Sequence, residues 1–76
     1  MSEKTIVDAR GAFCPGPLME LIATLKNIAI GDEVDVWSTD KGSVTDIPEW
    51  CKKVKHECVG VVEQQGYWSV LVRKAK

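Results

Sequence analysis

The spacing of apolar residues switches several times along this chain, and this alternation constrains the fold more than any other feature. The run Lys4–Ala9 is rich in β-branched residues and predicts a strand. Apolar residues then recur three and four positions apart, which places them on one face of a helix: Leu18, Leu21, Ile22, Leu25 and Ile28. Gly31 is expected to end that helix and begin a turn.

The middle of the chain repeats this order. Glu33–Ser38 alternates between two unlike faces and predicts a strand, with Asp35 and Trp37 opposite the valines. A second helix is predicted from a shared apolar face, which consists of Val44, Ile47, Cys51 and Val54. Pro48 is expected in its first turn, where a missing N–H is tolerated, and Asp46 just before it as the cap. The preceding stretch, "TDKGSVTD", is expected to be a loop in which Asp40 fits a turn.

The end of the chain predicts a β-hairpin. Glu57–Gln64 and Tyr67–Lys74 are strand-like, and Gln65–Gly66 supplies the turn. The order is therefore βαβαββ, which predicts an α/β (α+β) two-layer sandwich with a four-stranded mixed sheet and two helices on one face. The first βαβ unit is expected to be parallel and right-handed.

The size and charge of the chain limit the functions that can be expected of it. A chain of 76 residues is expected to form a single domain over residues 1–76. The net charge of −1 disfavours direct binding of nucleic acid. No apolar run is long enough to span a membrane and the first residues are polar, so a cytoplasmic location is expected. The three cysteines form an odd set that suits free thiols in a reducing compartment.

The segment "RGAFCPGPL" places Cys14 where the first strand gives way to the first helix. The N-terminus of a helix favours anions, so a thiolate there has a lowered pKa and is a better nucleophile. Arg10 adds a second positive charge if the loop folds back. The structural alternative is a small buried cysteine in a proline-rich loop, and the residues favour the functional interpretation.

Two prolines stiffen this segment. Pro15 and Pro17 lack an N–H, which leaves Gly16 and Leu18 as the nearest downstream donors to a Cys14 thiolate. The favoured register puts Pro17 at the first helical position with Gly16 as the cap. The other register begins the helix at Pro15 and caps it with Cys14. Either loop is expected to present the thiol rather than bury it.

The thiol has no local resolving partner, because position 17 is proline where a thioredoxin-like motif needs a second cysteine. This disfavours a dithiol–disulfide oxidoreductase. It suits a cysteine that holds a labile adduct such as a persulfide, which a neighbouring thiol would attack.

Two blocks of the chain resemble the TusA/SirA-like sulfur carrier (sulfurtransferase) family, and the similarity runs through most of the sequence. "VDARGAFCPGP" is similar to the family's Cys-Pro-x-Pro signature, and "GDEVDVWSTDKGSVTDIPEWC" to its second block. The positions that match the second block are Gly31, Asp32, Asp40, Asp46, Ile47, Pro48, Trp50 and Cys51. "KHECVGVVEQQGYWSVLVRK" is similar to the closing hairpin. The chain departs from common family patterns at Lys41 and Gly42 after Asp40, and in its three tryptophans. These departures leave open which branch of the family the chain belongs to.

The resemblance implies a βαβαββ sandwich and a role as a sulfur carrier. Members take sulfane sulfur as a persulfide on the cysteine that corresponds to Cys14, with no other cofactor. It implies a cysteine desulfurase or rhodanese-type donor and a DsrE-like acceptor, in tRNA thiolation, molybdenum cofactor synthesis or dissimilatory sulfur oxidation. A monomer that forms transient complexes is expected, with no membrane partner. Whether it turns over as an enzyme is left open, with a sulfurtransferase favoured.

Other candidates have plainer interpretations. Cys51 lies on an apolar helix face and is expected to be buried, and the spacing of His56 and Cys58 fits no common zinc site. The basic run Lys52, Lys53 and Lys55 is interpreted as a solvated helix face, with docking of an acidic partner as the alternative. Asp8 is expected to hold the Arg10 loop, and Trp37 either faces a partner or covers the sheet.

Two further functional classes compete with the sulfur carrier. The first is a non-catalytic regulatory or protein-interaction module, in which the Cys14 loop is only a docking edge. The second is an RNA-binding domain, against which the net charge of −1 argues.

Overall fold

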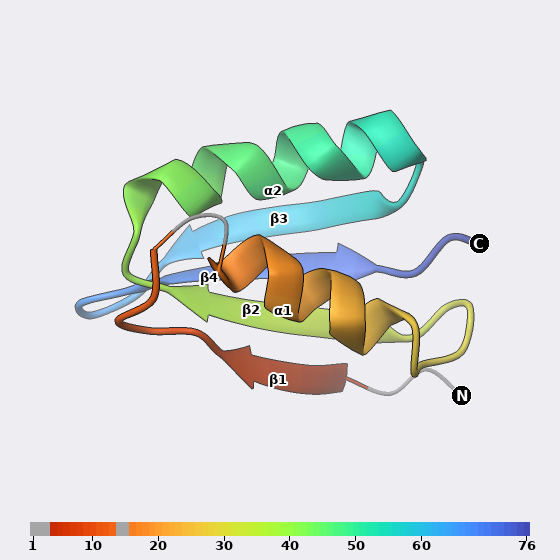
Figure 1. The fold of residues 1–76 in the computed structure, drawn as a ribbon, viewed down its shortest axis with the longest axis horizontal. Helices are drawn as coiled ribbons and strands as arrows, with labels where there is room; N and C mark the ends of the chain where they lie inside the picture. The colour runs from red at the N-terminus through yellow and green to blue at the C-terminus, as the bar shows by residue number, and fades with distance from the viewer. Residues whose placement is uncertain (1–3, 14–15) are drawn as a thin grey trace.

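The computed structural model describes residues 4–13 and 16–76 and has the predicted order βαβαββ (Figure 1). Its elements are β1 (Lys4–Asp8), α1 (Gly16–Leu25), β2 (Glu33–Ser38), α2 (Lys41–Val54), β3 (Glu57–Glu63) and β4 (Trp68–Arg73). The predicted fold class is confirmed, because the four strands form one mixed sheet and both helices pack into the same core.

The sheet has the strand order β1-β2-β4-β3. β1 and β2 are parallel, as predicted for the first βαβ unit, and β4 runs antiparallel to both of its neighbours. The hairpin therefore inserts its second strand beside β2 and leaves β3 at the edge. Gly66 in the hairpin turn has φ +85°, which agrees with the predicted turn at Gln65–Gly66.

The core lies between the helices and one face of the sheet. Val34 and Val36 of β2 are fully buried there, and so is Ser38, as the alternation of the sequence predicts. The buried apolar side chains are Val7, Ala9, Leu21, Leu25, Val34, Val36, Ile47, Cys51, Val70 and Val72. The apolar stripe of each helix thus covers the valine-rich inner face of β2 and β4.

The second helix begins earlier than the sequence predicts. Asp40 is its N-cap, and the carboxylate accepts hydrogen bonds from the Gly42 N–H (3.3 Å) and the Ser43 hydroxyl (3.1 Å). The predictions of a loop before Asp46, of a cap at Asp46 and of a first-turn Pro48 are therefore wrong. The capping bonds of Asp40 stabilise an additional turn, and Pro48 lies inside the helix as its eighth residue.

The first helix is shorter than its apolar pattern predicts, and the expectation that it continues to Gly31 is wrong. It ends at Leu25, although Ile28 still packs against the core from the segment that follows. Gly31 has φ +96°, which favours glycine, and its N–H donates to the Lys74 carbonyl (2.8 Å). The turn after α1 is thereby tied to the end of β4.

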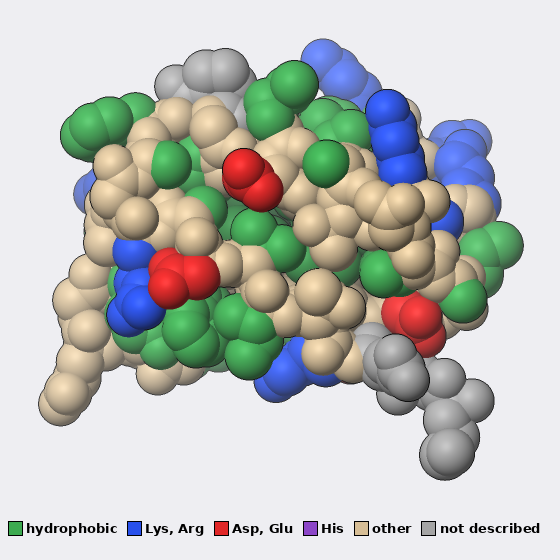
Figure 2. Space-filling view, turned by 60° about the horizontal axis from the view of Figure 1, so that its bottom comes forward, with side chains coloured by type: hydrophobic (Ala, Val, Ile, Leu, Met, Phe, Trp, Pro, Cys, Tyr) green, Lys and Arg blue, Asp and Glu red, His purple; other side chains and the backbone are tan. Residues whose placement is uncertain are grey.

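Polar contacts cover much of the outer face of the sheet. Arg73 on β4 pairs with Glu33 of β2 (3.0 Å) and with Glu57 of β3 (3.1 Å). Hydrophobic side chains also reach the surface in several separate places, as Figure 2 shows for one side of the molecule. Among residues 4–13 and 16–76, no helix is long and apolar enough to cross a bilayer.

Candidate functional site at the first strand–helix junction

A tight turn leads from β1 towards the candidate site. The Ala9 N–H donates to the Trp37 carbonyl (2.9 Å) and extends the pairing with β2 by one residue. Gly11 then adopts φ +89°, and its N–H donates to the Thr39 hydroxyl (2.8 Å). The sequence pair Arg10–Gly11 therefore forms a turn because glycine accepts this φ and Thr39 satisfies its N–H.

Arg10 is held by one carboxylate and two aromatic rings. Its guanidinium donates to both carboxylate oxygens of Asp8, and it lies 5.1 Å from the Trp37 ring and 5.2 Å from the Tyr67 ring. The hydrogen bonds with Arg10 lower the pKa of Asp8, and the same bonds raise the pKa of Arg10. The predicted link between Asp8 and the Arg10 loop is confirmed, and Trp37 covers the outer face together with Tyr67, 5.2 Å away.

The first helix has Gly16 as its first residue, so the favoured register, with Gly16 as the cap and Pro17 as the first helical residue, is wrong by one position. The other register depends on Cys14 and Pro15. The Gly16 N–H, which the sequence offers to a thiolate, donates in this structure to the Phe13 carbonyl (2.7 Å). Pro17 is buried in the first turn and Leu18 is half-buried beside it. Cys14 and Pro15 lie outside the described residues, so the role of Cys14 stays a prediction from the sequence.

Two exposed apolar side chains flank the site, and the sequence interpretation did not include them. Phe13 directly precedes Cys14 and is 77% exposed, and Met19 in the first turns of α1 is 60% exposed. A signal was available, because Met19 falls outside the apolar stripe that Leu18, Leu21 and Leu25 form.

The structure brings together two of the other predicted site residues. Leu18 and Asp46 line one cavity of about 480 Å³ between α1 and α2. Its remaining lining residues are Glu49, Trp50, Lys52 and Lys53. Part of the basic run therefore borders a groove beside the start of α1, whereas Asp40 serves as the cap of α2.

The two cysteines that the structure describes are poorly suited to nucleophilic chemistry. Cys51 is 1% exposed, and burial raises the pKa of its thiol to about 12, with a smaller contribution from Cys58. Burial also raises the pKa of the half-buried Cys58. A raised pKa keeps a thiol protonated and weakly nucleophilic at neutral pH. Within residues 4–13 and 16–76, no cluster of histidine, cysteine and acidic side chains could hold a metal ion.

The fold and the junction between β1 and α1 define a class of small α/β domain that carries its candidate nucleophile just before the first helix. Residues 5–74 match the family described as "Sulfurtransferase TusA". The chain therefore belongs to the TusA family.

Individual relatives agree with this assignment. An Archaeoglobus fulgidus protein named "Putative sulfur carrier protein" is 54% identical over 71 residues, which are 93% of this chain and 97% of that protein. The "Sulfur carrier protein TusA" of Pseudomonas putida (strain W619) is 36% identical over 69 residues, 91% of this chain and 86% of that protein. The crystal structure of a SirA-like protein from Desulfitobacterium hafniense superposes with a TM-score of 0.84 at 19% identity, over 95% of this chain and 99% of that one, and shows the same fold.

Proposed function

We propose that this protein is a sulfur carrier that accepts sulfane sulfur as a persulfide on Cys14 and passes it to an acceptor protein. The observation that carries the proposal is the contrast among the three cysteines. Burial raises the pKa of Cys51 and Cys58, whereas Cys14 occupies the Cys-Pro-x-Pro position in a chain of the TusA family. Cys14 is therefore the thiol best suited to the reaction.

The proposed reaction consists of two exchanges that balance without an external oxidant or reductant. The Cys14 thiolate attacks the outer sulfur of a donor persulfide, a new S–S bond forms, and the donor leaves as a thiolate. Cys14 then carries the group as Cys14–S–SH. An acceptor thiolate attacks the outer sulfur, takes it as a persulfide, and releases the Cys14 thiolate for another cycle.

The neighbouring groups support this chemistry in different ways. The start of α1 at Gly16 supplies a helix dipole that favours an anion just before it. Exposed Phe13 and Met19 supply apolar contact area for a partner beside the thiol. Arg10 supports the loop through Asp8 and the rings of Trp37 and Tyr67.

The partners follow from the same proposal. A cysteine desulfurase or a rhodanese-type protein supplies the sulfur, and a DsrE-like protein accepts it, in transient complexes with a monomeric carrier. The final destination is tRNA thiolation, molybdenum cofactor synthesis or dissimilatory sulfur oxidation. In each case the carrier contacts proteins and not the nucleic acid, in keeping with its net charge of −1.

Intact-protein mass spectrometry tests the proposal. After incubation with a polysulfide, or with a cysteine desulfurase and cysteine, the protein should gain the mass of one sulfur atom, and dithiothreitol should remove it. Cys14→Ser should abolish the gain. Cys58→Ser is the matched control, because it removes a half-buried thiol and should leave the gain unchanged.

Two outcomes would overturn the assignment. A mass gain that persists in Cys14→Ser would place the sulfur on another residue. A Cys14 thiol that reacts with iodoacetamide at pH 6 no faster than an unstructured cysteine would favour a non-catalytic interaction module instead.

A further inference from the structure

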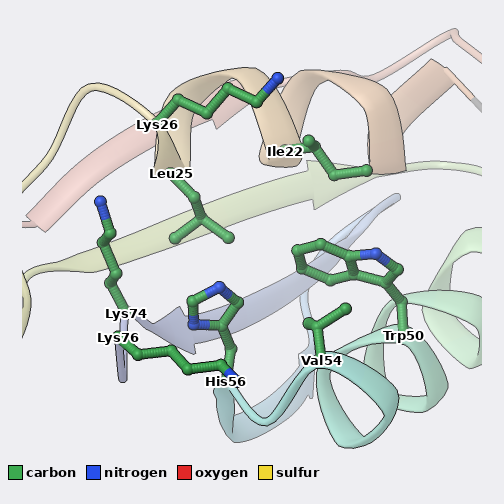
Figure 3. Close-up of a pocket in the computed structure, with 8 residues that line it drawn as sticks. All are labelled: Ile22, Leu25, Lys26, Trp50, Val54, His56, Lys74 and Lys76. Atoms are coloured by element: carbon green, nitrogen blue, oxygen red, sulfur yellow. The ribbon is translucent and has the colours of Figure 1, made fainter.

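A cavity of about 490 Å³ lies between α1 and α2 at the ends where both helices finish (Figure 3). Its apolar walls come from Ile22, Leu25, Trp50 and Val54. Its rim carries the basic side chains of Lys26, Lys74 and Lys76 together with His56. The volume is within the range of sites that bind small groups or single side chains.

The charged side chains that line this cavity are all basic. Among the described residues that line it, none is acidic. Lys74 is fixed in place, because its Nζ donates to the Ile28 carbonyl (2.8 Å), whereas Lys26 and Lys76 are exposed. Three lysines from two distant parts of the chain thus surround one apolar hollow, in a protein whose overall charge is −1.

His56 lies among these lysines, and their charges act on its pKa in addition to the larger effect of burial. Its Nδ1 accepts a hydrogen bond from the Ala75 N–H (3.1 Å), and its ring lies 5.7 Å from the Trp50 ring. Burial lowers the pKa of His56, and the charges of Lys74 and Lys76 lower it further. The lysines therefore repel an additional cation and favour an anion at the rim.

We infer that this cavity, which we call the basic groove (Ile22, Leu25, Lys26, Trp50, Val54, His56, Lys74 and Lys76), docks an acidic segment of a partner protein that carries an apolar side chain. The apolar side chain fills the hollow against Trp50 and Leu25, and flanking carboxylates meet the lysines. Charge complementarity selects the acidic partner.

The shape favours a peptide segment over other anions. Trp50 lines both this groove and the adjoining cavity at Leu18, so an extended segment can continue along the two helices. Its acidic part stays at the basic groove, because Asp46 and Glu49 also line the adjoining cavity. A nucleic acid would gain little from the apolar walls and would meet a chain of net charge −1. Inorganic anions would leave the apolar surface exposed.

The basic groove is separate from the proposed sulfur site. Leu25 and Gly16 are at opposite ends of the ten-residue α1, which sets them roughly 14 Å apart along the helix axis. The groove therefore gives a partner a second point of attachment away from Cys14. Docking requires no thiol chemistry and can be measured on its own.

Nuclear magnetic resonance of the full chain tests the inference, because His56 is the single histidine and gives one unambiguous imidazole signal. The probe is a pentapeptide with one phenylalanine between two pairs of glutamates. At millimolar peptide the His56 signal should shift, and its pKa should rise by about half a unit or more as carboxylates approach.

Matched variants separate the groove from general charge effects. Lys26→Glu should weaken binding about fivefold or more. Lys41→Glu, the same charge change at the opposite end of α2, should alter it less than about twofold. A peptide with serine in place of phenylalanine should bind more weakly, and a lysine version should leave the His56 signal unchanged.

The inference is overturned if the His56 signal does not respond to the peptide, or if Lys26→Glu and Lys41→Glu weaken binding equally. It is also overturned if the serine peptide binds as well, or if a single-stranded oligonucleotide binds more tightly at equal salt. The same titration on Cys14→Ser should give the same affinity. Failure of docking and failure of sulfur transfer are therefore distinguishable.

Discussion

Arg10 donates hydrogen bonds to both carboxylate oxygens of Asp8, from Nε at 2.8 Å and from Nη2 at 2.7 Å. The same carboxylate also accepts the Arg10 backbone N–H (3.2 Å). Asp8 ends β1 and Arg10 begins the turn towards Cys14, so the pair fixes the direction in which the chain leaves the sheet. The principal role of Arg10 in this geometry is to hold that turn.

The Asp8–Arg10 pair should make stability depend on pH in acid. The folded pKa of Asp8 is below its ordinary value of 3.8, so the pair contributes its full stability above about pH 3.8. That contribution is lost as the pH falls through the lower folded pKa. Urea unfolding should show that Asp8→Asn is less stable than wild type at pH 5 and that the difference shrinks towards pH 2.5. A difference that is constant across this range would contradict the assignment.

Gly11 should resist substitution because of its backbone conformation. A Cβ at this position would meet no atom within 4 Å, but φ is +89°, where residues with a side chain are strained. Gly11→Ala should therefore lower the free energy of unfolding by about 1–2 kcal/mol, measured by urea denaturation. Gly60→Ala is the matched control, because its Cβ also meets open space and its φ is outside the strained range. Equal losses in the two variants would argue against a conformational cause.

The cap of α2 should be Asp40 and not Asp46. Asp40→Ala removes acceptors for the Gly42 N–H and the Ser43 hydroxyl, and should cost about 1 kcal/mol of unfolding free energy. Asp40→Asn should retain most of this stability. Asp46→Ala, inside the helix, should cost less than Asp40→Ala in the same denaturation assay. A larger loss of unfolding free energy in Asp46→Ala than in Asp40→Ala would instead support a helix that is capped by Asp46, as the sequence predicts.

Cys51 should behave as a core residue. Its thiol is 1% exposed with a pKa of about 12, so iodoacetamide at pH 8 should modify it only after denaturation. Cys51→Ser places a hydroxyl in an apolar environment and should lower the free energy of unfolding by about 1–3 kcal/mol, measured by thermal or urea unfolding. Cys58→Ser should lower the free energy of unfolding by less, because Cys58 is only half-buried. Rapid alkylation of native Cys51 would show that the core opens at this position.

His56 should titrate below its ordinary value of 6.5, because burial and then Lys74 and Lys76 disfavour its charged form. The unfolded chain takes up the proton more readily, so stability should fall as the pH drops from about 6.5 through the lower folded pKa. His56→Gln should remove this dependence. Lys76→Gln should raise the His56 pKa part of the way back, as measured from the imidazole signal. An unchanged pKa in Lys76→Gln would show that Lys76 does not contribute, and would leave burial and Lys74 as the causes of the shift.

The sequence predicted helices and strands well where the apolar residues follow a single spacing, either that of a strand or that of a helix. Val34, Val36 and Ser38 are buried as their alternation requires, since a strand exposes successive residues to opposite faces. The helix at Leu21 and Leu25 follows equally from spacing. The start of α2 was predicted wrongly because Pro48 suggested a first turn, whereas the capping bonds of Asp40 stabilise a longer helix around it.

The candidate site also has one part that the sequence predicts and another part that only the tertiary structure shows. Cys14 and its prolines stand out in the sequence because they separate a strand-like run from a helix-like run. The resemblance to the TusA family rests on this segment together with the second block and the closing hairpin. The contacts of Arg10 could not be predicted in full, because Trp37 and Tyr67 reach it only after β2 and the hairpin pack side by side.

The sequence by itself determined the order of elements, the apolar faces, and a lone cysteine without a local thiol partner, because these depend on residues that are neighbours along the chain. The tertiary structure decided the strand order β1-β2-β4-β3, since a hairpin can join either edge of a βαβ unit. The tertiary structure also determined which side chains form the basic groove. Lys26 and Lys74 are far apart in sequence, and only the tertiary structure, in which Lys74 Nζ donates to the Ile28 carbonyl just after α1, brings both lysines to one apolar hollow.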